Sequence, residues 1–173
     1  MSHQNYACQS CGMPLASDEM RGTESDNSLS SQYCQHCYQN GSFTDPDITI
    51  DQMAGRVAPI INQMFEMSIE KAIVFSKEQL VSLFRWSGRM IPSCESCGMP
   101  IANDTDAGTM TDGTKTFQYC THCFQNGAFT EPELTKETMI AKYAPMMSAQ
   151  YDVPIHKAEE MVRIFAASLP RWR

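Results

Sequence analysis

The residues of this chain that could do chemistry are its eight cysteines, which all lie in four Cys-x-x-Cys pairs. The first pair is Cys8–Cys11 and the second is Cys34–Cys37, with 22 residues between them. The same arrangement returns at Cys94–Cys97 and Cys120–Cys123, with the same gap. Two residues between cysteines allow a tight turn that points both sulfurs at one ion, and a second such turn completes a tetrahedron. The spacing therefore predicts one four-cysteine metal site in each half of the chain.

Four thiolates suit a soft or borderline metal, and zinc is the usual ion of a closed, all-cysteine structural site. We therefore expect two zinc ions per chain, held by Cys8, Cys11, Cys34 and Cys37 and by Cys94, Cys97, Cys120 and Cys123. Because the units are small, binding the ion should supply a large part of the folding free energy, on the order of 10 kcal/mol.

The same cysteines admit other interpretations. Dithiol catalysis needs one pair with a lowered thiol pKa at a helix N-terminus, whereas two mirrored pairs in each half favour coordination. Iron is a less favoured alternative to zinc, because rubredoxin-type iron sites use the same two turns. His36 and His122 lie inside the second pairs. We expect these side chains to face solvent or pack on the ribbon, because four cysteines already fill each site.

The chain is an internal duplication with an offset of 86 residues. From Cys8 and Cys94 to Trp86 and Trp172 the copies align without a gap, and 33 of the 79 pairs are identical. A repeat that keeps every spacing indicates two units of one architecture. We therefore divide the chain into two domains, 1–87 and 88–173.

The cysteine-bearing part of each copy is predicted to form short strands and turns. Gly12 and Gly98 follow the second cysteine of the first pair, where a tight turn needs a residue that tolerates positive φ. Further turns are predicted at Asp26-Asn27, Asn40-Gly41, Asp112-Gly113 and Asn126-Gly127. Strands are predicted to lead into the second pairs through Gln32-Tyr33 and Gln118-Tyr119.

The remainder of each copy is predicted to be helical. First helices are expected over Ile50–Met64 and Lys136–Gln150, with Thr49 and Thr135 as N-caps. Pro59 and Pro145 should kink or break them. Second helices are expected over Ile69–Phe84 and Ile155–Leu169. The predicted fold is small α+β: two tandem zinc ribbons, built from hairpins that carry four-cysteine sites, each followed by two short helices.

Aromatic residues recur at matched positions in the two copies. They are expected to pack each ribbon against its first helix: Tyr33, Tyr38, Phe43, Tyr119, Phe124 and Phe129. An Arg-Trp pair ends each copy at Arg85-Trp86 and Arg171-Trp172, and we expect the tryptophan to close a small core.

The composition and charge of the chain limit the partners and the kinds of activity that we expect. The chain carries 13 basic and 20 acidic side chains, and each four-thiolate zinc site would add about two negative charges. This balance disfavours binding to a phosphate backbone, so nucleic acid is an unlikely partner. Neither a signal peptide nor a membrane span is expected, which favours a reducing cytoplasm. We find no catalytic constellation and expect a protein that is not an enzyme.

A longer motif resembles a known family. It comprises Cys-x-x-Cys-Gly-Met-Pro, Gly-Thr, Tyr-Cys-x-x-Cys-[Tyr/Phe], Asn-Gly-x-Phe-Thr and a terminal Leu-x-Arg-Trp, and it occurs in both copies. It is similar to the family of small bacterial proteins described as "putative zinc ribbon domain". The resemblance covers nearly all of Cys8–Trp172 and implies a bacterial cytoplasmic protein with zinc on all eight cysteines. The chain departs from the motif in its tails, where Phe84 stands in one copy and Pro170 in the other.

Three functions are compatible with these observations. The first is a module that binds a protein partner through its helices or ribbon edges. The second is a nucleic-acid-associated regulatory ribbon, which the net charge disfavours. The third is a rubredoxin-like iron electron carrier. The sequence sets neither the partner nor the oligomeric state.

Overall fold

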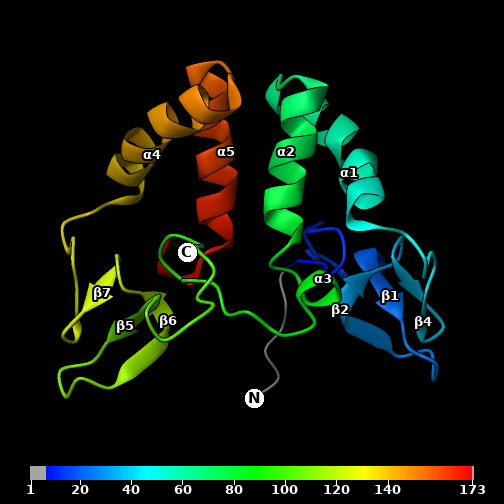
Figure 1. Ribbon diagram of the computed structural model, residues 1–173, viewed down its shortest axis with the longest axis horizontal. Coiled ribbons are helices and arrows are strands. Elements are labelled where there is room, and N and C mark those ends of the chain that lie inside the picture. Colours follow the sequence, from blue (N-terminus) through cyan, green and yellow to red (C-terminus); the bar gives the residue numbers. More distant parts are fainter. Residues whose placement is uncertain (1–6, 173) are drawn as a thin grey trace. The chain divides into compact units, whose positions relative to one another are not determined.

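The computed structural model describes residues 7–172, and it comprises two compact units. The first unit lies within Met1–Ile61 and Ile69–Met90, and the second within Asn62–Ser68 and Ile91–Arg173. In each repeat a ribbon of short β-hairpins precedes two helices (Figure 1). This is the small α+β fold that the sequence predicted. None of the helices in the described part of the chain is long and apolar enough to cross a membrane.

Each ribbon consists of two antiparallel hairpins. The first unit contains β1 (Arg21–Thr23) paired with β2 (Leu29–Cys34), and β3 (Tyr38–Gln39) paired with β4 (Ser42–Phe43). The second unit repeats this with β5 (Ala107–Thr109), β6 (Lys115–Cys120), β7 (Phe124–Gln125) and β8 (Ala128–Phe129). A short 3-10 helix, η1 (Asp18–Met20), precedes β1. Two-stranded sheets of this size are marginal on their own in water, so each ribbon needs another source of stability.

The predicted turns are confirmed. Asn40 and Gly41 have φ values of 52° and 78°, the two successive positive angles that a tight two-residue hairpin requires. Asn27 in the first ribbon and Gly113 in the second adopt φ values of 65° and 81° at the tips of the longer hairpins. These positions accept the left-handed conformation because glycine and asparagine pay little steric penalty for it.

The helices follow the predicted order. The first unit has α1 (Ile50–Phe65), α2 (Ile69–Leu80) and the short α3 (Phe84–Ser87), and the second has α4 (Lys136–Tyr151), α5 (Ile155–Ser168) and the 3-10 helix η2 (Pro170–Trp172). Thr135 caps α4 as predicted, since its side chain accepts a hydrogen bond from the backbone of Thr138. Thr49 does the same for Gln52 at the start of α1.

Neither proline breaks its helix. The sequence predicted a kink or a break at Pro59 and Pro145; α1 and α4 both continue through them, so the break does not occur. Proline removes one hydrogen bond to the carbonyl four residues earlier. Those residues, Gly55 and Ala141, are exposed, so water can bind the freed carbonyl. Burial of the opposite helix face then holds the helix together, as the fully buried Ala58 of α1 shows.

The second helix of the first unit ends earlier than predicted. The sequence placed its end at Phe84, but α2 ends at Leu80 and the chain turns before α3. Leu83 adopts an extended conformation with φ −74° and ψ 148°. This turn lets the backbone of Arg85 bond to the carbonyl of Gln9 in the ribbon, at 3.0 Å. A tertiary contact therefore outweighs the local preference to continue the helix.

The Gly-Thr element of the sequence motif marks a close approach between strands. A Cβ atom placed on Gly22 would lie 2.1 Å from the carbonyl oxygen of Tyr38, and one on Gly108 would lie 2.6 Å from that of Phe124. Only glycine lets β1 and β5 cross so near the second hairpin of their ribbons.

We predict that Gly22→Ala lowers the free energy of unfolding by about 3 kcal/mol, because a methyl group there must displace the backbone of β3. Urea denaturation of the metal-loaded protein measures the change. Gly55→Ala is the matched control, because no atom lies within 4 Å of its Cβ position and alanine favours a helix by up to about 1 kcal/mol. A Gly22→Ala protein as stable as the wild type would contradict the close approach.

Candidate metal centre

The structure brings the eight cysteines together in two clusters of four. The clusters are Cys8, Cys11, Cys34 and Cys37 in the first unit and Cys94, Cys97, Cys120 and Cys123 in the second. The sulfur atoms within each cluster all lie within 4.8 Å of one another. These are the two groups that the repeated spacing predicted.

The sulfur positions fit a tetrahedral ion. Four sulfurs at about 2.3 Å from one zinc lie about 3.8 Å from each other. The Cys11 and Cys34 sulfurs are 3.7 Å apart, and those of Cys97 and Cys120 are 3.6 Å apart. Such distances are far too long for a disulfide bond, and all eight cysteines are free. The clusters are therefore fit to hold metal ions.

Each first pair forms a tight turn around its sulfurs, which we call the first knuckle of the unit. In the first unit the amide of Gly12 bonds to the carbonyl of Cys8 at 2.9 Å, and Gly12 has φ 78°, as predicted for this position. Gly98 adopts φ 74° in the second unit. The amide of Cys34 also donates to the Cys8 sulfur at 3.3 Å. Such amides offset the negative charge that thiolates gather at a metal site.

Hydrogen bonds among the sulfurs shift the pKa values of the clustered thiols in opposite directions. Hydrogen bonds from Cys11 and its neighbours hold the pKa of Cys8 below its ordinary value. The pKa of Cys11 is raised because its thiol donates chiefly to Cys34. In the second unit the pKa of Cys94 is lowered by hydrogen bonds from Cys123 and Cys97. A metal held by four thiolates must displace the retained protons, so metal affinity should fall as the pH falls.

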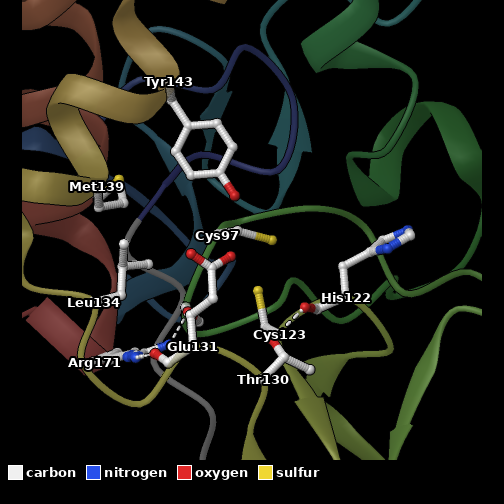
Figure 2. Close-up of a pocket in the computed structure, with 10 residues that line it drawn as sticks. Cys97, His122, Cys123, Thr130, Glu131, Leu134, Met139, Tyr143 and Arg171 are labelled. Carbon is white, nitrogen blue, oxygen red and sulfur yellow. Dashed lines mark hydrogen bonds between the residues drawn. The ribbon is translucent and has the colours of Figure 1, made fainter.

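The two knuckle histidines are not part of the clusters. His36 and His122 are both exposed, and the metal-ligating groups found in residues 7–172 contain cysteine alone. Figure 2 shows the His122 ring pointing away from the sulfurs of Cys97 and Cys123. Its backbone carbonyl instead accepts a hydrogen bond from the hydroxyl of Thr130 at 2.6 Å.

The terminal Arg-Trp pair of the first unit binds the first knuckle. Trp86 donates its indole N–H to the carbonyl of Ser10 at 2.7 Å, and Arg85 donates to the Ser10 hydroxyl at 3.0 Å. The Arg85 guanidinium also lies over the Phe43 ring, 3.9 Å from its centroid, and donates to the carbonyl of Asp45 at 2.6 Å. The C-terminal end of the repeat thus holds in place, by hydrogen bonds, the turn that carries two of the four cysteines.

The second unit has the same hydrogen bonds between its terminal Arg-Trp pair and its first knuckle. Trp172 donates to the carbonyl of Ser96 at 2.6 Å, and Arg171 donates to the Ser96 hydroxyl at 2.8 Å. Arg171 lies 3.8 Å from the centroid of Phe129 and donates to the carbonyl of Glu131 at 3.0 Å. The tryptophans therefore pack where the sequence predicted, at the closure of each unit.

Sequence reasoning missed the serine inside the first knuckle. Ser10 is 0% exposed and Ser96 is 2% exposed, although short polar residues are seldom buried so fully. The available signal was that both copies carry serine between the cysteines of the first pair. Its partner lies 75 residues away along the chain, which no local pattern reveals.

The ribbon aromatics form a three-ring cluster in each unit. Tyr33, Tyr38 and Phe43 lie with ring centroids 5.0 to 5.4 Å apart, and the second unit repeats the arrangement. In the first unit these rings belong to the same hydrophobic cluster as Met53 and Ala54 of α1, as predicted. The packing against a helix differs between the units, however.

The two cysteine clusters differ in how far neighbouring side chains shield them from solvent. Cys37 is buried at 5% exposure, whereas its counterpart Cys123 is partly exposed. In the first unit the buried cysteines form one hydrophobic cluster with helix residues, including Met53 and Leu80. In the second unit the described ribbon cluster consists of Cys94, Ile101, Ala107 and Cys120, with Cys97, Tyr119 and Cys123 packed against it.

Comparison with known proteins identifies both repeats. The sequence model of a family described as "putative zinc ribbon domain" matches residues 7–87 and again residues 93–173. A search of curated proteins and a search of solved structures found no match to the chain.

We predict that Trp86→Phe lowers the stability of the first unit by about 1–3 kcal/mol, because the buried Ser10 carbonyl loses its indole donor. The first site should then also release its metal to a chelator faster, while the second is unaffected. Chelator competition, with the released metal assigned to each site by cysteine labelling, measures this. Arg89→Ala, which changes an exposed side chain, is the control. Unchanged release from the first site would show that the tryptophan does not support the knuckle.

Proposed function

Because the chain belongs to the zinc ribbon family, we propose that each repeat holds one structural zinc ion on its four cysteines. The observation that carries this proposal is the convergence of four largely buried sulfurs at distances that suit a tetrahedral ion. The family match supports zinc over iron. Eight free thiols also favour a reducing compartment such as the cytoplasm.

We propose that the ions stabilise the fold and do not catalyse a reaction. A closed site of four thiolates leaves the ion no position for water or a substrate, which makes it a poor Lewis acid. The ribbons themselves bury few side chains, so the ion takes the place of a hydrophobic core. Free energies on the order of 10 kcal/mol are typical of such sites.

Metal analysis tests this proposal directly. We expect two zinc ions per chain in freshly purified, reduced protein, and loss of the folded state when a strong chelator removes them. Circular dichroism and metal quantification follow the two changes together. A red sample that absorbs visible light would show iron instead of zinc.

Single-site variants refine the test. Cys8→Ser and Cys94→Ser should each reduce the content to one zinc per chain, because a hydroxyl is a poor replacement for a thiolate ligand. Each variant serves as the control for the other, since the intact site should keep its ion. Two ions bound by Cys8→Ser would contradict the assignment of this cysteine as a ligand.

We further propose that the chain is an interaction module that binds a protein partner through its helices. Exposed apolar side chains on α2 and the turn that follows it support this, because Val74 and Val81 are 49% and 56% exposed. The second unit has similar positions on α4 and α5, where Met146 is 63% and Ile164 46% exposed. Such side chains are common at protein interfaces, whereas the acidic net charge disfavours nucleic acid.

Paired variants test this second proposal. A partner captured by the zinc-loaded wild type should be lost by Val81→Glu, because a charge at the centre of an apolar contact is costly. Glu78→Gln is the control. It changes the charge at an exposed position of α2 but places no charge in an apolar contact. Equal capture by wild type and Val81→Glu would remove the C-terminal end of α2 and the turn after it from the proposal. A shift of labelled DNA or RNA that weakens with salt would instead favour a nucleic-acid-binding ribbon.

A further inference from the structure

The metal site of the second unit opens onto a pocket between its ribbon and its helices. Figure 2 shows the pocket with two cysteine sulfurs, those of Cys97 and Cys123, at its wall. Helix α4 contributes Met139 and Tyr143, and the Tyr143 ring extends toward Cys97 with its hydroxyl leading. The pocket therefore brings two sulfur atoms and a phenolic hydroxyl close together.

The corresponding region of the first unit is filled. Cys37 stands where Cys123 does, and it is only 5% exposed. It packs in one buried cluster with Ile48 and Met53, and Leu80 of α2 completes the same cluster at 1% exposure. Apolar side chains thus enclose Cys37 in the first site, whereas Cys11 is partly exposed, as Cys97 is in the second.

The sequence explains why the two units differ. Ala166 replaces Leu80 at the matched position, so α5 places a smaller apolar side chain there than α2 does. Tyr143 replaces Val57, and its polar end points into the pocket rather than packing as an aliphatic side chain does. The ligands are identical in the two copies, but their surroundings are not.

Solvent access decides how thiolates at a metal site react. A zinc-bound thiolate keeps nucleophilic character, and oxidation selects cysteines that are both deprotonated and accessible. The hydrophobic shell around a metal site controls that access. Cys97 and Cys123 meet both conditions once an ion is bound. In the first unit Cys11 is also partly exposed but Cys37 is buried, so only the second unit presents two accessible thiolates.

We propose that Cys97 and Cys123 form a modification site at which a hydroperoxide reacts, with release of the zinc ion of the second unit. This inference rests on the zinc sites proposed above. The first unit keeps its ion longer under the same conditions, because Cys11 is partly exposed but its second thiolate, Cys37, is buried among Ile48 and Met53.

The reaction balances with the peroxide as oxidant. One thiolate attacks a peroxide oxygen, so an S–O bond forms, the O–O bond breaks and hydroxide leaves, which gives a sulfenic acid. The second thiolate then attacks that sulfur, so an S–S bond forms and a second hydroxide leaves. Two protons from solvent convert both hydroxides to water. Zinc loses two of its four ligands and dissociates. The Tyr143 hydroxyl lies where it can hydrogen-bond to the peroxide.

The test treats the full, zinc-loaded chain with hydrogen peroxide. Zinc release is followed with a chromogenic chelator, and the remaining thiols are alkylated and identified by mass spectrometry. We expect one zinc to leave roughly tenfold faster than the other, with a disulfide between Cys97 and Cys123 in that phase. The first-unit cysteines should still take up the alkylating label after denaturation.

Variants at the cover of the first site test the cause. Leu80→Ala should speed release from the first unit toward the rate of the second, because it removes the cover that Ala166 lacks. Val81→Ala, at a 56% exposed position on the turn that follows α2, is the matched control and should leave both rates unchanged. Tyr143→Phe keeps the ring and should slow the fast phase.

The wild-type result alone can overturn the proposal, so it does not depend on the variants folding. Release of both ions at one rate, or oxidation of the first-unit cysteines before the second, would contradict it while leaving the two zinc sites in place. A preparation with no zinc before the peroxide is added would contradict both this inference and the proposed function.

Discussion

Four sulfur atoms must be held within reach of one ion, and the ribbons that carry them are too small to do this by burial. Their strands contain two to six residues, and sheets of this size gain little from hydrogen bonding alone. The first knuckle of each unit is therefore held by side chains that lie outside the ribbon, at the C-terminal end of the repeat. Ser10 is the point of attachment, and Arg85 and Trp86 hold it from the far end of the repeat. The metal site and the C-terminal helices depend on each other because they share this contact.

The sizes of the interactions show how this dependence works. A hydrogen bond to a buried carbonyl contributes about 1 kcal/mol net, and an unmet one costs about 1–3 kcal/mol. A structural zinc ion contributes on the order of 10 kcal/mol. In the zinc-loaded protein that we propose, the ion would dominate the free energy of folding, whereas the Arg-Trp contacts fix the end of each repeat to its first knuckle. Removing a contact should loosen one unit, but removing an ion should unfold it.

The sequence predicted most of the ribbon, because metal geometry leaves a direct trace in residue spacing. The four Cys-x-x-Cys pairs, the turn at Asn40-Gly41 and the N-cap at Thr135 are local signals, and the structure confirms them. The early end of α2 was missed because it serves a contact with Gln9, which lies far away along the chain. Of the kink or break expected at Pro59, the structure excludes only the break, since packing of one helix face outweighs one lost hydrogen bond.

The two repeats differ more in their helical tails than in their cysteine-bearing parts. Their cysteine-bearing parts are similar because one ion geometry requires the same turns and the same glycines. Between the first and second repeats, identities fall sharply in the helical tails. In the first unit Leu80 of this tail belongs to the cluster that buries the cysteines, and alanine stands at the matched position, Ala166, in the second unit. A duplicated site can therefore keep its ligands and change its chemistry, because accessibility is set by residues that never touch the metal.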